Sequence, residues 1–396
     1  MLAVIETHPV QYHAPVYRAL QQVLNVPVTA VYGSDFSIAG YRDAGFGTSF
    51  AWDTNLLAGY QSVFLSRVAD GGAATADTVT TDGMREALAR INPSAVLIVG
   101  YSPRFHRVAW MEGLRTGAPL LFRGEANDAA RERSWWRARA REIALRMAYG
   151  RCSRVLYIGE AARQHYRRMG VADDRLVFSP YCVDDTTFAW GALSRSELRA
   201  PAREELQLRD DDVLILFSGK LIEQKAPQLV IEAVRLLHPD DRAGVVVGFL
   251  GDGPLRPSLD ELAAASPRVA IRQIGFRNQR EISRYYHAAD LFVLPSRAET
   301  WGLVVNEALL HGVPAIVSDR VGSGLDLVEP GVTGEVCETG SAESLAAAIV
   351  RAAALVGKPD VRDRCQERVK RYSVRAAAEG VAAAYRVATA DRERCA

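Results

Sequence analysis

Short apolar runs alternate with longer segments of helical periodicity along this chain, and that alternation limits the folds that it can adopt. The apolar runs are residues 2–5, 27–31, 95–99, 119–122 and 155–158, and then 213–217, 245–250, 269–274, 291–294 and 313–317. Helical spacing of apolar residues lies between them, for example at 84–90, 161–169, 227–237 and 279–288. Such short runs are typical of strands buried on both faces of a parallel sheet. We therefore expect an α/β protein with doubly wound parallel sheets.

A break in the alternation divides the chain. With 396 residues the chain is longer than one hydrophobic core normally supports. The stretch 178–200 contains Pro180, Asp184 and Asp185 among several serines and threonines, which is typical of a linker. We expect two Rossmann-like domains, residues 1–195 and 196–372, and a C-terminal helix over 373–396 that packs back toward the N-terminal domain.

Composition and charge exclude several classes of protein. Hydrophobic residues make up 48% and charged residues 24%, as in ordinary globular proteins, and a formal net charge of +1 argues against a nucleic-acid partner. The five cysteines are odd in number and form no CxxC pair, which argues against a disulfide framework and a zinc site. The start of the chain does not have the pattern of a signal peptide, and no run of about 18 apolar residues occurs. We expect a cytoplasmic protein.

Two glutamates, Glu299 and Glu307, lie between the apolar runs 291–294 and 313–317. Their position predicts a loop that carries Glu299, followed by a helix that carries Glu307. In α/β sheets, ligands bind at the carboxyl ends of strands, where helix N-termini offer unpaired N–H groups to anions. Two carboxylates beside an anion site indicate that each accepts hydroxyl protons. A nucleotide sugar carries both the hydroxyls and the anion.

Two further loops follow predicted strands and are suited to phosphate. The segment 218–225 contains Gly219, whose small size lets the backbone approach a ligand, and the cations Lys220 and Lys225. The segment 251–254, Gly-Asp-Gly-Pro, turns the chain into a helix. Each loop alone is ordinary α/β connection chemistry. Both loops and the two-glutamate segment are expected at the same edge of one sheet, which favours a phosphate-binding site.

Taken in order, these segments resemble the motifs of the retaining family-four glycosyltransferases of the GT-B fold. The matching pieces are 218–220 with Lys225, then 251–254, 274–276, 295–303 with 307–308, and 312–316. The likeness is close over about residues 210–350, whereas the N-terminal half resembles the family only in layout, apart from the crossing segment 179–184 with Phe188. The resemblance implies two Rossmann-like domains that face across a cleft, with the acceptor side on the N-terminal domain and the nucleotide-sugar site on the C-terminal domain.

The resemblance also implies roles for individual residues. Glu307 is expected to accept hydrogen bonds from the donor ribose, while Lys220 and Lys225 neutralise the diphosphate. Glu299 is expected near the anomeric carbon, where it stabilises positive charge during front-face attack with retention. The remaining donor-binding residues implied are Gly219, Gly275, Phe276, Thr300, Trp301, Gly302 and Leu303. No metal and no other cofactor is expected, because lysines and backbone dipoles neutralise the leaving group.

The acceptor is a hydroxyl compound that no motif identifies, and the donor base is left open with a preference for uridine. Where the family carries other loops, this chain has His8, His13, Arg123 and Glu125, which we expect to line the acceptor side. Structural roles for these four groups are an equal alternative. A nucleotide-sugar 2-epimerase of the same fold is the alternative function, and a binding protein without catalysis is disfavoured because both glutamates and both lysines are present.

The segment 131–147 combines arginines with two adjacent tryptophans. Such a helix can contact an anionic membrane surface from its periphery, which would suit a lipid-linked acceptor. We favour the alternative of a solvated helix whose apolar side, including Trp136, Ile143 and Met147, covers the N-terminal sheet.

Overall fold

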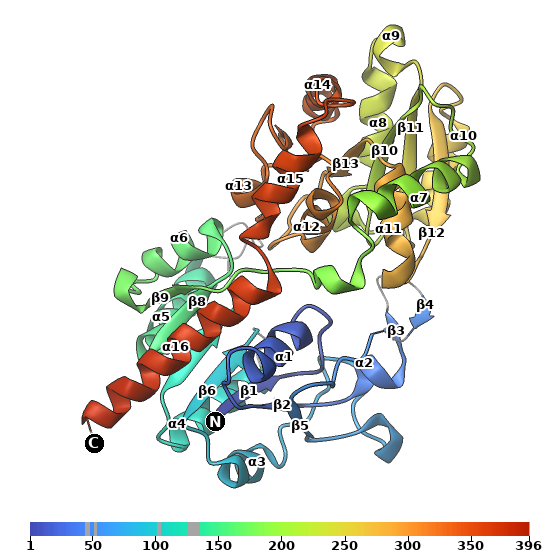
Figure 1. Cartoon of the computed structure of the whole chain (residues 1–396). Coiled ribbons are helices and arrows are strands. Elements are labelled where there is room, and N and C mark those ends of the chain that lie inside the picture. Colours follow the sequence, from blue (N-terminus) through green and yellow to red (C-terminus); the bar gives the residue numbers. More distant parts are fainter. Residues whose placement is uncertain (44–47, 51–53, 101–103, 126–134, 396) are drawn as a thin grey trace. The chain divides into compact units, whose positions relative to one another are not determined.

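Each of two units in the chain is built on one parallel sheet (Figure 1). The structure is a computed structural model that describes residues 1–43, 48–50, 54–100, 104–125 and 135–395. Unit 1 comprises Met1–Tyr41, Ser49–Cys182 and Tyr372–Ala396, and unit 2 comprises Arg42–Thr48 and Val183–Arg371. The parallel sheets with intervening helices confirm the predicted α/β class.

The sheet of unit 1 has seven strands in the order β5-β2-β1-β6-β7-β8-β9. Their bounds are β1 Leu2–Glu6, β2 Val28–Tyr32, β5 Gln61–Phe64, β6 Ala95–Val99, β7 Leu120–Arg123, β8 Arg154–Tyr157 and β9 Leu176–Phe178. Two short strands, β3 (Tyr41–Asp43) and β4 (Thr48–Phe50), pair with each other. The strands with long apolar runs were predicted, but the edge strands β5 and β9 were not, because their residues are only partly buried.

Seven α-helices belong to unit 1 among the described residues. They are α1 Ala14–Gln22, α2 Phe36–Ala39, α3 Met84–Ile91, α4 Phe105–Arg115, α5 Trp135–Arg151, α6 Glu160–Arg168 and α16 Val374–Cys395, with the 3-10 turns η1 Val68–Asp70 and η2 Asp173–Arg175. The alanine-rich helix α16 packs against α1, β8 and β9. A Cβ on Gly380 would lie 2.0 Å from Phe178 O, so glycine permits this close approach.

Helix α5 does not turn its expected apolar side to the sheet. Among its described side chains, Leu145 and Tyr149, one turn apart, are buried at 2% exposure each, whereas Ile143 is 56% and Met147 64% exposed. The expectation that Ile143 and Met147 cover the sheet is therefore wrong. The side chain of Trp136 and the whole of 131–134 lie outside the described residues.

The sheet of unit 2 has six strands in the order β12-β11-β10-β13-β14-β15. Their bounds are β10 Val213–Ser218, β11 Val245–Leu250, β12 Ala270–Gly275, β13 Leu291–Leu294, β14 Ala315–Ser318 and β15 Gly334–Cys337. The chain builds outward from β10 in one direction and then returns to add β13 on its other side. The strand order thus reverses between β10 and β13, which is the switch point where doubly wound sheets hold ligands.

The helices of unit 2 begin earlier in the chain than expected. They are α7 Ala192–Glu205, α8 Gln228–Leu236, α9 Pro239–Arg242, α10 Arg256–Ala264, α11 Gln279–Ala288, α12 Leu303–Leu310, α13 Gly324–Leu327, α14 Ala342–Ala353 and α15 Val361–Lys370, with η3 Asp185–Thr187 and η4 Glu223–Lys225. The stretch 178–200, expected as a linker, is helical from Ala192 onward. Asn278 and Glu281 form a capping box that starts α11.

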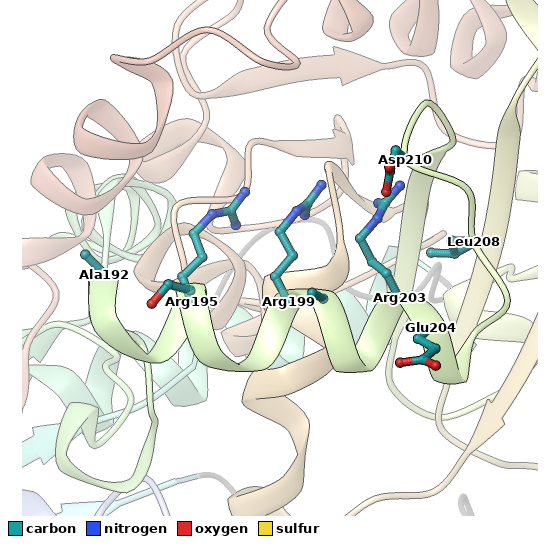
Figure 2. A pocket seen from close by; sticks show the side chains of 9 residues that line it. Ala192, Arg195, Arg199, Arg203, Glu204, Leu208 and Asp210 are labelled. Atoms are coloured by element: carbon teal, nitrogen blue, oxygen red, sulfur yellow. The ribbon is translucent and has the colours of Figure 1, made fainter.

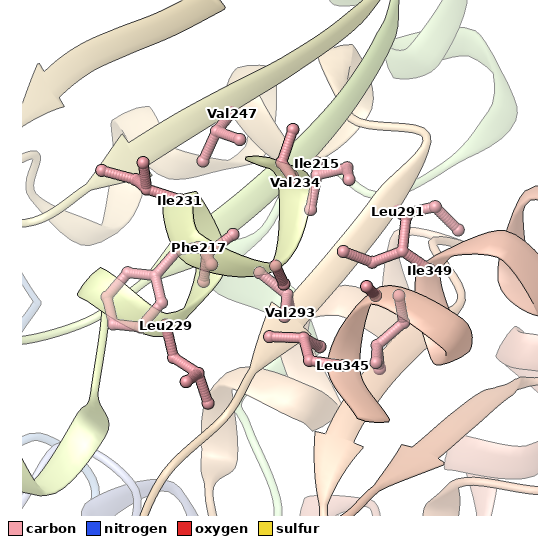
Figure 3. Close-up of a cluster of buried hydrophobic side chains, with 14 of the residues drawn as sticks. Ile215, Phe217, Leu229, Ile231, Val234, Val247, Leu291, Val293, Leu345 and Ile349 are labelled. Carbon is pink, nitrogen blue, oxygen red and sulfur yellow. The ribbon is translucent and has the colours of Figure 1, made fainter. Parts of the chain in front are cut away.

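The core of unit 2 anchors the two strands at the switch point (Figure 3). Phe217 of β10 and Val293 of β13 are fully buried, and Ile231 and Val234 of α8 and Ile349 of α14 belong to the same apolar cluster. Strands buried in this way are rigid supports for the loops at their carboxyl ends.

Candidate active site

Three loops of unit 2 meet at the carboxyl ends of β10, β11 and β12. The Gly219 amide donates to Leu250 O at 2.9 Å, and the Gly251 amide donates to Gly275 O at 2.9 Å. Gly251 has a φ of 142°, and a Cβ there would lie 2.0 Å from Gly219 O, so no larger residue fits. The glycines thus allow the backbones to touch, and Gly219, Lys220 and Gly275 reach one edge of the sheet, as expected.

Lys225 and Glu299 form an ion pair at this edge. Lys225 ends η4 in the loop after β10, and Glu299 lies in the loop after β13. Lys225 Nζ is 2.8 Å from Glu299 Oε2, and only 17% and 16% of the two side chains are exposed. The Arg297 amide also donates to Gln224 O at 2.8 Å, which joins the same two loops. Because β10 and β13 flank the switch point, the pair lies where a doubly wound sheet binds ligands.

The segment after β14 forms hydrogen bonds with the loop that carries Glu299. The Glu299 amide donates to Arg320 O at 3.1 Å, and the Gly322 amide donates to Glu299 O at 3.0 Å. Gly302, with a φ of 92°, then precedes the first residue of α12, and a Cβ there would lie 3.2 Å from Glu299 Cγ. The backbone therefore fixes the Glu299 carboxylate beside the N-terminus of α12.

Trp301 faces the interior of unit 2. Its side chain is buried, and Nε1 donates to Asn306 Oδ1 at 2.8 Å, while its carbonyl accepts from the Ser323 amide at 3.0 Å. The indole thus braces the first turn of α12, and only the backbone of Trp301 is suited to a ligand at the edge. The other donor-side candidates are half-buried at this edge: Lys220, Phe276 and Thr300 in its loops, and Leu303 at the start of α12.

Glu307 is a buried carboxylate on α12. Its Oε2 accepts a hydrogen bond of 2.7 Å from the hydroxyl of Tyr286 on α11. The sequence pattern pointed to Glu307 but not to Tyr286, since a tyrosine in a helix of ordinary periodicity is read as core. The structure therefore adds Tyr286 as the partner that orients this carboxylate.

A neutral histidine, His311, contacts both Tyr286 and Glu307. The His311 ring stacks on the Tyr286 ring, with centroids 5.0 Å apart and planes at 17°. His311 Nδ1 is 2.7 Å from Glu307 O, and because a carbonyl only accepts, Nδ1 carries the proton. Nε2 then accepts from the Ser283 hydroxyl at 3.0 Å. Burial lowers the pKa of His311 to about 3, so the ring is uncharged at neutral pH.

The four acceptor-side candidates all belong to unit 1. His13 Nδ1 lies 2.5 Å from Glu6 Oε1, and His8 Nδ1 lies 2.9 Å from the Thr7 hydroxyl oxygen. Burial lowers the pKa of His8 to about 4. His8 and His13 were predicted from the sequence, whereas Glu6, which ends an apolar strand, gave no separate signal.

Arg123 and Glu125 hold the end of the crossing segment within unit 1. Arg123 donates from Nε to Ser179 O at 3.2 Å and from Nη2 to Pro180 O at 2.7 Å, and its guanidinium lies 4.9 Å from the centre of the Tyr181 ring. The Tyr181 hydroxyl donates to Glu125 Oε1. These contacts give both side chains a structural task.

A hollow of about 620 Å³ lies along α7, on another part of unit 2 (Figure 2). Arg195, Arg199 and Arg203 extend from one face of this helix. Arg199 donates to the carbonyls of His287, Ala288 and Ala289 and to Asp290 Oδ1. The arginines therefore cap the C-terminus of α11, where cations stabilise a helix. The rest of the lining is Ala192, Ser196, Ala200, Glu204, Leu208 and Asp210.

Neither a metal site nor a membrane-spanning helix is found among the described residues. No group of three or more His, Cys, Asp or Glu side chains there could hold a metal ion. None of the helices described combines the length and apolar character needed to cross a membrane.

Sequence comparisons relate part of the chain to known glycosyltransferases. Residues 199–372 match the family model of the glycosyl transferases group 1. The chain is 30% identical over 250 residues to the alpha-D-kanosaminyltransferase of Streptomyces kanamyceticus, a match that covers 61% of this chain and 62% of that protein. It is 32% identical over 243 residues to the D-inositol 3-phosphate glycosyltransferase of Nocardia farcinica, covering 58% and 52%. The chain thus spans less than two thirds of the length of these relatives.

Solved structures share the fold over nearly the whole chain. A glycosyltransferase from Rickettsia africae is similar with a TM-score of 0.72 at 13% identity, covering 98% of both chains. The Anabaena protein HepE, solved in complex with UDP and glucose, is similar with a TM-score of 0.66 at 15% identity, covering 96% of this chain and 98% of that one. At such identities the likeness shows the fold alone.

Proposed function

We propose that the chain, whose residues 199–372 match the family model of the glycosyl transferases group 1, transfers a sugar from a nucleoside-diphosphate sugar to a hydroxyl group of an acceptor. The GT-B fold expected from the sequence is confirmed by the structural neighbours. The observation that carries the proposal is the Lys225–Glu299 pair, which unites a cation for phosphate and a carboxylate for the sugar at the switch point of one sheet.

The contacts of unit 2 support a division of roles. Lys220 and Lys225 neutralise the donor diphosphate, and the diphosphate competes with Glu299 for Lys225. Glu299 then faces the positive charge that develops on the sugar carbon. In front-face attack the leaving phosphate takes the proton of the acceptor hydroxyl, which retains the anomeric configuration. Anomeric retention, measured by proton NMR of fresh product, is the expected outcome, and inversion would contradict it.

The nucleoside is proposed to bind on the other side of the same edge. Glu307, oriented by Tyr286, accepts hydrogen bonds from the ribose hydroxyls, and Gly275 with Phe276 supports the base. Uridine is favoured because HepE, a structural neighbour of the same fold, was solved in complex with UDP. The reaction is proposed to need no metal, since the two lysines and the amides at the start of α12 supply the positive charge.

A thermal-shift panel of nucleotide sugars tests the donor proposal. A donor at a hundred times its dissociation constant stabilises the folded chain by about 2.7 kcal/mol. We expect a UDP-sugar to raise the Tm, and we expect Lys225→Ala to reduce that shift. Lys370→Ala, which removes an exposed lysine paired with Glu367, is the matched control. A panel in which no nucleotide sugar shifts the Tm would contradict the proposal.

Release of free nucleoside diphosphate separates transfer from the alternative of 2-epimerisation. A transferase releases the diphosphate in step with acceptor consumption. Overall epimerisation of a nucleotide sugar consumes no acceptor and leaves no free diphosphate behind. Conversion of the donor sugar without diphosphate release would therefore favour the epimerase.

Helix α5 supports a peripheral contact with an anionic membrane surface. Ile143 and Met147 are exposed on the helix, and they are flanked by Arg139 and Arg146, whose exposed guanidinium groups both pair with Glu142. Apolar side chains beside arginines are typical of interfacial helices. Such a contact would bring the chain to a lipid-linked acceptor.

A further inference from the structure

A second hollow of unit 2 is lined by four arginines and a single acidic residue. Its volume is about 560 Å³, and it lies beside the amino-terminal ends of β11 and β12, where Val245 and Ala270 belong to its lining. The loops of the candidate active site follow the opposite, carboxyl ends of these strands. The arginines are Arg209, Arg242, Arg268 and Arg272, and the acid is Asp212. The hollow is therefore separate from the candidate active site and carries an excess of positive charge.

The acid of the hollow is already neutralised by one of the arginines. The buried Asp212 carboxylate accepts hydrogen bonds from the Arg209 amide at 2.8 Å, from Nε at 3.1 Å and from Nη2 at 2.9 Å. The exposed Asp211 also lies 3.5 Å from Arg209 Nε. Asp240 and Asp241 of α9 are exposed and do not belong to the lining. The positive excess of the hollow therefore comes from its other three arginines.

Two of these three arginines are held in place by uncharged groups. Arg272 of β12 donates to three backbone carbonyls, those of Leu206, Gln207 and Ile271, at 2.6, 3.3 and 3.1 Å. Arg242 donates from Nη1 to two backbone carbonyls at the end of α8. A carbonyl carries only a partial negative charge. These bonds therefore orient the two guanidinium groups at the ends of α7 and α8 without neutralising them.

The third arginine, Arg268, lies in the loop between α10 and β12 and is exposed. Its side chain has no hydrogen-bond or ion-pair partner in the described part of the chain, and neither Arg242 nor Arg272 pairs with a carboxylate there. A guanidinium has five N–H donors, so Arg268 keeps all five and Arg272 keeps two. The hollow thus combines uncompensated charge with N–H groups that can donate to a ligand.

The number and type of these cations favour an oxyanion with more than one charge. Three guanidinium groups around one hollow repel each other, and an anion between them offsets that repulsion. The planar fork of a guanidinium donates two parallel hydrogen bonds to phosphate oxygens. A phosphate group carries a charge of about −2 near pH 7, whereas chloride or one carboxylate carries a single charge. Phosphate therefore suits the hollow best.

We propose that this hollow is a binding site for a phosphate group, held by Arg242, Arg268 and Arg272. The phosphate is inorganic phosphate or part of a small phosphate ester. Because the hollow lies at the opposite ends of the strands from the Lys225–Glu299 pair, the bound anion takes no part in sugar transfer. It joins the ends of α7 and α8 to the start of β12, and binding therefore stabilises unit 2.

Isothermal titration calorimetry of the full chain tests this site, with inorganic phosphate and glycerol 3-phosphate as the probes. Sodium chloride at equal ionic strength is the control ligand. We expect saturable binding of at least one probe and a rise in Tm that chloride does not cause, and the tighter probe identifies the source of the phosphate group. Absence of saturable binding of both probes would overturn the inference.

Arg268→Ala should weaken phosphate binding by about tenfold and leave the Tm in phosphate-free buffer unchanged, because Arg268 has no partner in the described chain that the substitution could remove. Arg268→Lys, which keeps the charge, should restore part of the affinity. Arg371→Ala is the matched control, since Arg371 is an exposed arginine of unit 2 outside the hollow. Equal phosphate affinity of Arg268→Ala and the unmodified chain would overturn the inference.

Lys225→Ala separates this hollow from the proposed donor site, which also attracts phosphate. Phosphate affinity that is kept in Lys225→Ala and reduced in Arg268→Ala assigns the anion to the hollow, whatever the outcome for UDP. The reverse pattern, loss in Lys225→Ala and normal affinity in Arg268→Ala, would overturn the inference and leave the donor proposal standing.

Discussion

Lys225 and Glu299 are 74 residues apart in the chain, yet their charged atoms are 2.8 Å apart. Neither residue could hold its position without the backbone bonds that join the loops after β10, β13 and β14. In the free protein the pair neutralises two mostly buried charges that would otherwise be costly. Under the proposed function, a diphosphate would offer Lys225 a second anion and so weaken the Lys225–Glu299 ion pair.

Glu299→Gln should leave folding intact and lower turnover by about 10² to 10⁴-fold, as expected when a carboxylate positioned at the reacting group is removed. Nucleotide affinity should stay near normal or rise slightly, because Lys225 loses its competing partner. Steady-state kinetics and calorimetry with UDP measure the two effects. Glu335→Gln is the control, since Glu335 is a buried carboxylate paired with Arg351. A variant with full turnover would remove Glu299 from catalysis.

Glu307→Ala should weaken donor binding by roughly 2 to 4 kcal/mol, because it removes a charged acceptor of two ribose hydroxyls.

Tyr286→Phe should raise the donor KM about tenfold with little change in kcat, since it removes only the hydrogen bond that orients Glu307. Tyr285→Phe removes the neighbouring buried hydroxyl, which bonds to Glu205, and should leave the KM unchanged. Equal effects of the two tyrosine variants would mean that Tyr286 acts through general stability.

At the scale of elements, helix α5 has apolar side chains both on its buried side and on its solvent-exposed side. Leu145 and Tyr149 bury one side in unit 1, while Ile143 and Met147 remain exposed beside arginines. Exposed apolar side chains are common singly, but a pair one turn apart within a basic helix indicates a surface that contacts something.

The double variant Ile143→Ser, Met147→Ser should weaken binding to vesicles that contain phosphatidylglycerol by about tenfold or more, since each apolar side chain contributes roughly 1.5 kcal/mol or more on burial. Vesicle sedimentation measures this, with neutral phosphatidylcholine vesicles for comparison. Leu193→Ser on α7 is the matched control, because Leu193 is 81% exposed in unit 2. Identical sedimentation of the double variant and the unmodified chain would exclude α5 as the contact.

At the scale of the whole molecule, buried neutral histidines make stability depend on pH. Burial lowers the pKa of His8 to about 4, of His287 to about 4 and of His311 to about 3. In the unfolded chain each histidine titrates near its ordinary value of about 6.5. Below that pH the unfolded state binds protons that the folded state excludes, so stability is present above the unfolded pKa and is lost as pH falls toward the folded pKa.

The free energy of unfolding should therefore fall between about pH 6.5 and pH 3 to 4, with His311 alone contributing up to about 1.4 kcal/mol per pH unit. Urea denaturation at pH 7, 6, 5 and 4 measures the slope. His311→Gln should flatten that slope even though it lowers stability at pH 7. His238→Gln, which removes an exposed histidine, should leave it unchanged. A slope that His311→Gln does not alter would show that other groups cause the acid sensitivity.

The amino-acid sequence by itself determined the central strands and the position of the donor-side loops. Strands such as β6, β10 and β11 are buried on both faces, so their apolar runs are continuous and are visible without any knowledge of their neighbours. Once the strands are parallel, their carboxyl ends lie at one edge, and Gly219, Lys225 and Glu299 follow as neighbours at that edge.

Only the tertiary structure decided which side chains face each other across long separations. The edge strands β5, β9 and β15 are short, and β5 and β9 are only partly buried, so local periodicity does not mark them. Which side of α5 is buried depends on what packs against the helix. The spacing of Ile143 and Met147 does not predict this. The partners of Glu307 and Glu6, namely Tyr286 and His13, come from neighbouring elements. Burial and orientation are properties of the packed interior, and no local pattern of residue types encodes them.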